Sequence, residues 1–185
     1  MSQEHPQTSQ HRSYFKDLSI VLSAYIVAGI CTYLAYTYFV NSLGKDSLIQ
    51  SIILDIFATS VVFLFSLAAG NTSVYDIYWG VATIPLATFW IKNTTQDLFS
   101  TKNVFFLILL AIYTFRHVRL YFSHWTGLQY EDFRYVDMKK KVNNNPWLFW
   151  ILSFISLHMI PTLFVLTAMI PVYDGVIATE ITSSW

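Results

Sequence analysis

The sequence contains few charged residues. Asp, Glu, Lys and Arg together make up 12% of its 185 residues, whereas soluble domains carry about 25%. Hydrophobic residues supply 55% of the chain. A chain with so little charge and so much apolar surface is unsuited to folding in water, so we expect it to reside in a lipid bilayer.

Other scarcities exclude further classes of protein. The 11 basic residues are balanced by 11 acidic ones, so the chain lacks the basic excess of a nucleic-acid-binding protein. Its single cysteine, Cys31, excludes an internal disulfide and a cysteine-rich metal cluster. The His-Glu-x-x-His, glycine-rich phosphate-loop and Gly-x-Ser-x-Gly motifs are also missing. We therefore predict no metal site and no nucleic-acid partner.

Long apolar stretches make up most of the sequence. A helix needs about 20 apolar residues to cross the roughly 30 Å hydrocarbon core of a bilayer. The stretches that meet or approach this length cover residues 18–40, 48–70, 74–91, 104–122 and 147–172. We predict an all-α integral membrane bundle of about five transmembrane helices over residues 18–172. A polar segment at 1–17 precedes it and a short tail at 173–185 follows.

Two of these stretches are irregular. The third contains Gly80 and Pro85, which predict close packing and a kink. The fourth has an uninterrupted apolar run only over residues 104–115, before Arg116 and Arg119. It can cross the membrane only if both arginines are accommodated there.

The distribution of Lys and Arg predicts the orientation. Threading the five stretches through a bilayer places eight basic residues on one side, namely Arg12, Lys16, Arg116, Arg119, Arg134, Lys139, Lys140 and Lys141. The other side receives Lys45, Lys92 and Lys102. Because basic residues accumulate on the cytoplasmic side, we expect a cytoplasmic N-terminus, and five crossings then put the C-terminus on the opposite side.

Arg116 and Arg119 are three residues apart and therefore lie on one helical face, with Tyr113 one turn earlier. Two interpretations remain open. Together the three side chains could hold a phosphate, or the arginines could extend to the lipid headgroups, as arginines near helix ends commonly do.

The connection over residues 125–141 gathers charged and phenolic groups: Glu131, Asp132, Arg134 and Tyr135. Such a group can orient a polar ligand at the membrane surface. An equally good interpretation is a set of mutual salt bridges that fixes the loop between two helices, since surface ion pairs of this kind are common and weak.

Isolated ionisable residues occur elsewhere in the apolar stretches. Asp76 precedes Trp79 at the start of the third stretch, where helix capping and the helix dipole would explain a carboxylate. Asp55 and His158 lie within the second and fifth stretches. Either could relay protons or pair with an arginine, but a buried hydrogen bond between helices is the simpler expectation for both.

Taken in order, several of these features resemble one family. They are Asp76-x-x-Trp79-Gly80, the helix end with Arg116 and Arg119, the string Glu131-Asp132-Phe133-Arg134-Tyr135, and a helix that opens with Trp147 and Trp150. Over residues 71–174 the chain resembles the uncharacterised branch of the steroid 5-alpha-reductase-like membrane proteins.

The resemblance implies a multi-helix membrane fold, with the endoplasmic reticulum as a candidate location. Better-known relatives use NADPH to reduce a carbon-carbon double bond conjugated to a ketone in a steroid or another lipid. Related folds include isoprenylcysteine carboxyl methyltransferases, which use a different cofactor. Carried over to this chain, the resemblance assigns the cofactor to Arg116, Arg119, Arg134 and Tyr135, and the substrate pocket or its loop to Asp76, Trp79, Glu131 and Asp132.

The family pattern continues with further helices and a late Arg-His-Pro-Asn-Tyr signature followed by Gly-Glu, which supplies much of the cofactor site. The sequence reaches Trp185 without this signature. We therefore expect either a lipid or steroid reductase that is incomplete in this chain, completed by sequence further on or by a partner subunit, or a non-catalytic membrane scaffold or assembly subunit. Membrane lipids and a hydrophobic substrate are the other expected partners.

Overall fold

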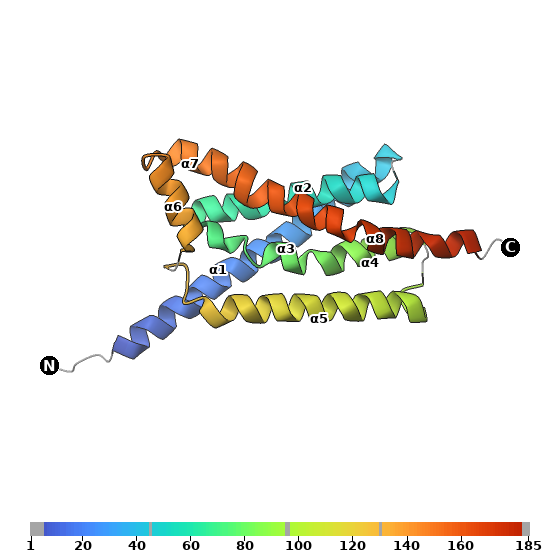
Figure 1. The fold of residues 1–185 in the computed structure, drawn as a ribbon, viewed down its shortest axis with the longest axis horizontal. Coiled ribbons are helices and arrows are strands. Elements are labelled where there is room, and N and C mark those ends of the chain that lie inside the picture. The colour runs from blue at the N-terminus through green and yellow to red at the C-terminus, as the bar shows by residue number, and fades with distance from the viewer. Residues whose placement is uncertain (1–5, 45, 95–96, 130, 183–185) are drawn as a thin grey trace.

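The computed structural model describes residues 6–44, 46–94, 97–129 and 131–182, with side chains between residues 14 and 176. All regular secondary structure in these ranges is helical (Figure 1). The α-helices are α1 (Pro6–Ala35), α2 (Ser47–Ala69), α3 (Tyr78–Val81), α4 (Thr83–Thr94), α5 (Thr101–His124), α6 (Phe133–Lys141), α7 (Pro146–Leu152) and α8 (Ile160–Thr182). The predicted all-α class is confirmed.

Short stretches of other helix types complete the chain. Two π-helices, Tyr36–Val40 and Ser153–Met159, extend α1 and join α7 to α8, while 3-10 turns form at Asn41–Leu43 and Thr72–Val74. A π-helix contains an extra residue per turn and widens the helix locally. Each of the two long terminal helices is therefore continuous but carries one wide turn.

Among the described residues, four helices are long and apolar enough to cross a membrane: Tyr14–Leu43, Ser47–Ala69, Thr101–His124 and Pro146–Val176. The protein is therefore a multi-pass membrane protein. The predicted span at 74–91 differs, because it consists of the short helices α3 and α4 instead of one continuous helix. It still runs through the bundle, with α4 packed beside α5 and α8 (Figure 1).

The break between α3 and α4 has an identifiable cause. Pro85 has no N–H to donate to the carbonyl of Val81, so the helical ladder is interrupted just after α3. The hydroxyls of Thr83 and Thr114 donate to the carbonyl of Gly80 at 2.9 and 3.0 Å. Because lipid cannot satisfy a backbone carbonyl, these hydroxyls stabilise the carbonyl of Gly80 next to the break.

Both predicted terminal segments prove more helical than expected. α1 begins at Pro6, inside the segment 1–17, because a proline is well placed in the first helical turn and no Gly or Pro follows before residue 18. α8 continues to Thr182 through most of the predicted tail at 173–185. The last three residues lie outside the described part of the chain.

Several helix starts are fixed by side-chain caps. Asp46 accepts a hydrogen bond from the Ile49 N–H at 2.8 Å at the start of α2. Asn145 caps α7 in the same way, directly before Pro146. Asp132 caps α6, a helix that the sequence had predicted only as part of a loop. Capping by short polar side chains satisfies N–H groups that have no partner inside the helix.

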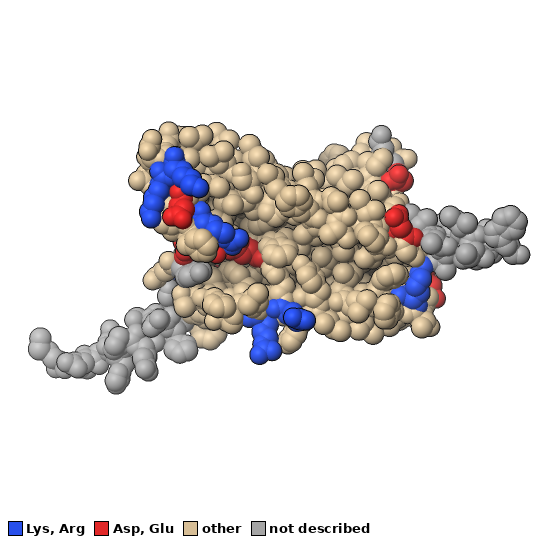
Figure 2. All heavy atoms as spheres, viewed as in Figure 1, with Lys and Arg blue, Asp and Glu red and all other residues tan. Residues whose placement is uncertain are grey.

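The two ends of the bundle carry separate charged groups. α6, with Lys139, Lys140 and Lys141 in its last turn, lies at the end where α5 finishes and α7 begins (Figures 1 and 2). Lys92, in the last turn of α4, and Lys102, in the first turn of α5, lie at the opposite end. This separation agrees with the predicted threading, while the cytoplasmic location of the α6 end stays a prediction.

The arrangement can be tested with single cysteines. In a Cys31→Ser background, we expect Lys140→Cys and Lys92→Cys to react with a membrane-impermeant maleimide from opposite sides of the membrane, because these residues lie at opposite ends of the bundle. Labelling of sealed inside-out and right-side-out vesicles measures this. Reaction of both cysteines from the same side would contradict the fold.

Candidate functional site

A cavity of about 340 Å³ opens at the end of the bundle that carries α6. We call it the polar pocket. Side chains from α3, α5, α6, the start of α8 and the connections before α3 and α6 line it, including Tyr75, Asp76, Trp79, His117, Tyr121, Trp125, Asp132, Arg134 and Tyr135. It combines aromatic rings with acidic, basic and imidazole groups, a composition typical of sites for polar ligands.

The segment between α2 and α3 builds one wall of the polar pocket. Asn71 accepts from the Ser73 N–H at 2.7 Å and so starts the 3-10 turn, while its amide donates to the carbonyl of Leu128 at 2.7 Å. One asparagine thus shapes this segment and ties it to the connection that precedes α6. The link joins residues 57 positions apart in sequence.

Asp76 does not act as a helix cap. The residue before α3 is Ile77, and no side chain caps that helix. The Asp76 carboxylate accepts a hydrogen bond from the Tyr135 hydroxyl of α6. The capping explanation is therefore wrong, because a tertiary partner on α6 takes the carboxylate instead.

Burial governs the charge of Asp76, which lies in the connection between α2 and α3, outside the four candidate spans. Loss of hydration raises its pKa to about 7, although the hydrogen bond from Tyr135 and the charge of Arg134 act in the opposite direction. The same buried environment raises the pKa of the Tyr135 phenol well above its usual range. The pair therefore retains its phenolic proton at neutral pH.

His117 is a pocket residue that the sequence did not single out. One of its ring nitrogens, Nε2, is hydrogen-bonded to the backbone carbonyl of Asp76 at 2.9 Å. Its ring lies against Gly80, where a Cβ atom would collide with it, and 4.0 Å from the ring centre of Trp79. The prediction that Gly80 allows close packing is confirmed, and the group it admits is this imidazole.

The charged groups around α6 largely satisfy one another. Arg134 donates to both carboxylate oxygens of Asp132, at 2.8 and 3.0 Å, and this interaction lowers the pKa of Asp132. Lys139 donates to both oxygens of Glu131, at 2.6 and 2.8 Å. The salt-bridge interpretation of this connection therefore holds for both pairs. Asp132 and Arg134 nevertheless face the polar pocket, with much of the guanidinium exposed.

The structure brings together only some of the predicted site residues. Those that line the polar pocket are Asp76, Trp79, Asp132, Arg134 and Tyr135. Glu131 lies beside it in its pair with Lys139. Arg116 and Arg119 are exposed on α5 and are not among the lining residues, because the α5 positions that face the pocket are His117 and its helical neighbours Leu120, Tyr121 and His124.

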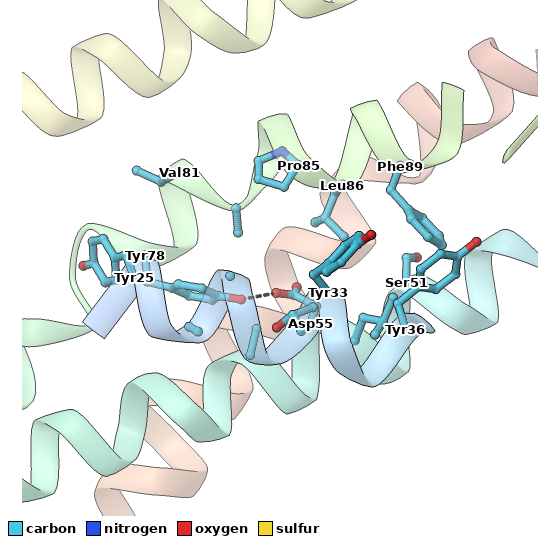
Figure 3. A pocket seen from close by; sticks show the side chains of 16 residues that line it. Tyr25, Tyr33, Tyr36, Ser51, Asp55, Tyr78, Val81, Pro85, Leu86 and Phe89 are labelled. Carbon is cyan, nitrogen blue, oxygen red and sulfur yellow. Dashed lines mark hydrogen bonds between the residues drawn. The ribbon is translucent and has the colours of Figure 1, made fainter. Parts of the chain in front are cut away.

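A second cavity, of about 290 Å³, lies inside the bundle between α1, α2, α3 and α4 (Figure 3). We call it the membrane cavity. Its walls are mostly apolar and aromatic, and Tyr33 and Phe89 belong to them. One carboxyl group, that of Asp55 on α2, is buried in this wall and accepts a hydrogen bond from the Tyr78 hydroxyl at 2.7 Å.

Asp55 and His158 both take the simpler of their predicted roles. Asp55 joins α2 to α3 through Tyr78. His158, in the π-helix, is hydrogen-bonded to the carbonyl of Ser153 at 2.9 Å and to the hydroxyl of Ser66 on α2 at 3.2 Å. The prediction of buried interhelical hydrogen bonds is confirmed for both residues.

The two cavities share a wall. Tyr75 lines the polar pocket and Tyr78 the membrane cavity, and their ring centres are 5.5 Å apart. The short segment that carries both tyrosines therefore separates a polar compartment at the end of the bundle from an apolar compartment within the membrane. In the part of the chain that the structure describes, no three His, Cys, Asp or Glu residues lie close enough to hold a metal ion.

Comparison with known proteins identifies a family. Residues 62–184 match the family described as "Protein of unknown function (DUF1295)", and the chain belongs to it. The match covers the polar pocket and the α3 to α8 part of the bundle. No curated protein matches the chain, and no solved structure matches it.

Replacement of Gly80 tests the packing of His117. A Gly80→Ala substitution places a methyl group against the imidazole, and we expect it to lower the free energy of unfolding by about 1–3 kcal/mol, as overpacking usually does. Thermal unfolding of the purified protein in detergent measures the change. Gly29→Ala is the matched control, because no atom lies within 4 Å of the added methyl group. An equal effect of both substitutions would contradict this account.

The raised pKa of Asp76 predicts a pH dependence. Unfolding returns the carboxyl to an ordinary pKa of 3.8 from about 7, so the folded state binds more protons between these values and stability falls as pH rises. We expect the melting temperature in detergent to decrease from pH 5 to pH 8. Asp76→Asn should remove this decrease, whereas Asp137→Asn, at an exposed site on α6, should retain it. An unchanged slope in Asp76→Asn would refute the assignment.

Proposed function

We propose that this DUF1295 protein forms the substrate-binding part of a membrane-embedded, NADPH-dependent reductase. The reaction would reduce a carbon-carbon double bond conjugated to a ketone in a lipid or steroid-like substrate. The observation that carries the proposal is the hydrogen bond between Tyr78 and Asp55 in the wall of a mostly apolar and aromatic cavity within the membrane.

The membrane cavity suits a hydrophobic ketone. Its apolar and aromatic walls favour transfer of a lipid from the bilayer. Tyr78 supplies a hydroxyl proton that a substrate oxygen could accept in place of Asp55. When hydride adds to a conjugated enone, negative charge develops on the ketone oxygen, and a preorganised hydrogen-bond donor in a water-poor site stabilises that charge most effectively.

The polar pocket offers groups that fit part of a nicotinamide cofactor. Arg134 presents a partly exposed guanidinium, and the buried indole N–H of Trp125 has no hydrogen-bond partner among the described residues. Arginine pairs well with phosphate oxygens, and Trp79 and Tyr121 add faces for stacking. Bound NADPH supplies the hydride. Within this proposal the polar-pocket residues hold one end of the cofactor, and a partner subunit or additional sequence supplies the rest of the cofactor site.

The shared wall supports an arrangement in which the cofactor and the substrate approach from opposite sides. Hydride transfer requires the reacting atoms to lie about 3–3.5 Å apart, so the two compartments must adjoin. Tyr75 and Tyr78, with ring centres 5.5 Å apart, lie on the segment between the two compartments, so within this proposal that segment moves aside for the reacting atoms to meet. The resemblance to steroid 5-alpha-reductase-like proteins supports the same reaction class and, with it, residence in the endoplasmic reticulum.

One observation favours an alternative. The charged groups of the α6 region are paired with one another, Asp132 with Arg134 and Glu131 with Lys139. Such pairing suits a non-catalytic scaffold or assembly subunit, in which these residues only fix α6 against the bundle. This alternative requires no cofactor.

Ligand-induced stabilisation distinguishes the reductase from the non-catalytic scaffold. We expect NADPH, and separately a steroid with a 4-en-3-one group, to raise the melting temperature of the purified protein. Saturation at about 100 times the dissociation constant adds about 2.7 kcal/mol. Tyr78→Phe should lose most of the response to the steroid and keep the response to NADPH, since only the membrane cavity is altered. Tyr33→Phe, in the same cavity, is the matched control.

The outcomes discriminate clearly. A wild-type protein that responds to neither ligand supports the scaffold and overturns the reductase proposal. A steroid response that is the same in Tyr78→Phe and in the wild type removes the phenol from substrate binding. Loss of the response in Tyr33→Phe as well as in Tyr78→Phe points to general disturbance of the cavity.

A further inference from the structure

α5 carries a basic patch on its outer face. Arg116 and Arg119 are both exposed there, and their spacing places them on the same side of the helix. Among the described residues, the ion pairs involve Arg134, Lys139 and Lys140, and none includes either arginine. α5 itself contains no Asp or Glu. The patch therefore carries two positive charges without a carboxylate on its own helix.

The patch lies inside the span and not at its tip. Arg116 and Arg119 precede the last residue of α5, His124, by eight and five residues. At a rise of 1.5 Å per residue these separations are about 12 and 8 Å along the helix axis. Figure 2 shows a basic group over α5, apart from the charges of the α6 region. A guanidinium at this depth needs an anionic or strongly polar partner, because hydrocarbon offers none.

The surroundings of the patch are suited to acyl chains. Ile108, Ile112 and Phe115 are large and exposed on the preceding turns of α5. Long arginine side chains near a helix end direct their charged groups toward the headgroup layer, while their aliphatic stems remain in hydrocarbon. A phosphate at the base of the headgroup layer then meets two guanidiniums at once, a geometry in which arginine binds phosphate strongly.

Charge and symmetry argue against a second copy of this chain at the patch. A twofold contact through this face of α5 would bring Arg116 and Arg119 of both copies together. Four like charges in a low-dielectric interface would repel one another. The dinucleotide of the proposed function is also a poor candidate, since neither arginine lines the polar pocket.

We propose that Arg116 and Arg119 form a binding site for the phosphate of an anionic phospholipid at the α6 end of the bundle. The acyl chains of this lipid lie along the apolar outer face of α5. A net negative headgroup complements the two unopposed charges better than a zwitterionic one. The site is independent of any catalytic activity.

Native mass spectrometry of the full chain in detergent, titrated with phosphatidylglycerol and with phosphatidylcholine, tests this proposal. We expect the wild type to prefer phosphatidylglycerol. The double variant Arg116→Gln/Arg119→Gln should bind it about tenfold more weakly, a loss of the size expected when charge-assisted phosphate contacts disappear. Arg116→Lys/Arg119→Lys should retain part of the preference, because the charge stays while the bidentate geometry is lost.

The matched control removes two other charges at the same end of the bundle. Lys140→Gln/Lys141→Gln lies on exposed positions of α6 and should leave lipid binding unchanged. Equal weakening in this variant would mean that the lipid responds to overall charge, and would overturn the site.

Three further results would overturn the proposal. One is equal binding of both lipids by the wild type. Another is displacement of phosphatidylglycerol by NADPH, which would assign the arginines to the cofactor. The third is a loss of oligomers, without a loss of lipid, in Arg116→Gln/Arg119→Gln, which would assign the patch to a second copy of the chain.

Discussion

The fold depends on satisfying backbone carbonyls where the chain stops being helical inside the bundle. Between α2 and α4 the carbonyls of Ser73, Val74, Asp76 and Gly80 receive hydrogen bonds from side chains, and none of these carbonyls is left to lipid. The donors are the Tyr121, Tyr25, Thr83 and Thr114 hydroxyls and a ring nitrogen of His117. Because a buried backbone carbonyl without a hydrogen-bond partner is costly, these side chains stabilise the break between α2 and α4.

That constraint also explains why the two cavities adjoin. The donors come from α1 on one side of the broken segment and from α5 on the other, so the segment is held between these helices, with His117 of α5 packed directly against Gly80. Space remains on both sides of it. Tyr75 lines the polar pocket and Tyr78 lines the membrane cavity, so the short segment that carries both tyrosines forms the wall between the two cavities.

The sequence predicted the fold well wherever a pattern extends over a whole helix. Long apolar runs identified four spans, and Gly80 and Pro85 marked the place where the third stretch is broken. Helix α6 was not predicted from the sequence, because its start depends on a single cap, Asp132. The partner of Asp76 could not be predicted either, because Tyr135 is 59 residues away and only tertiary structure brings the two together.

The candidate site was predictable in part for the same reason. A short string such as residues 131–135 contributes three pocket residues because it starts one helix. Arg116 and His117 are adjacent in sequence and equally noticeable, yet about 100° of helical rotation separates them and only His117 faces inward. Sequence spacing showed that the two arginines share a face, but the side of α5 that meets the bundle depends on its neighbours.

The π-helical turn at Ser153–Met159 affects which side of α8 faces the bundle. One additional residue in a helix advances the later positions by about 100° about the axis. Leu166 and Met169, which follow this turn, pack in the buried cluster that includes Trp90. The rotation of α8 about its own axis therefore depends on this π-helical turn, where His158 is buried, about two to three turns before the residues that pack against the neighbouring helices.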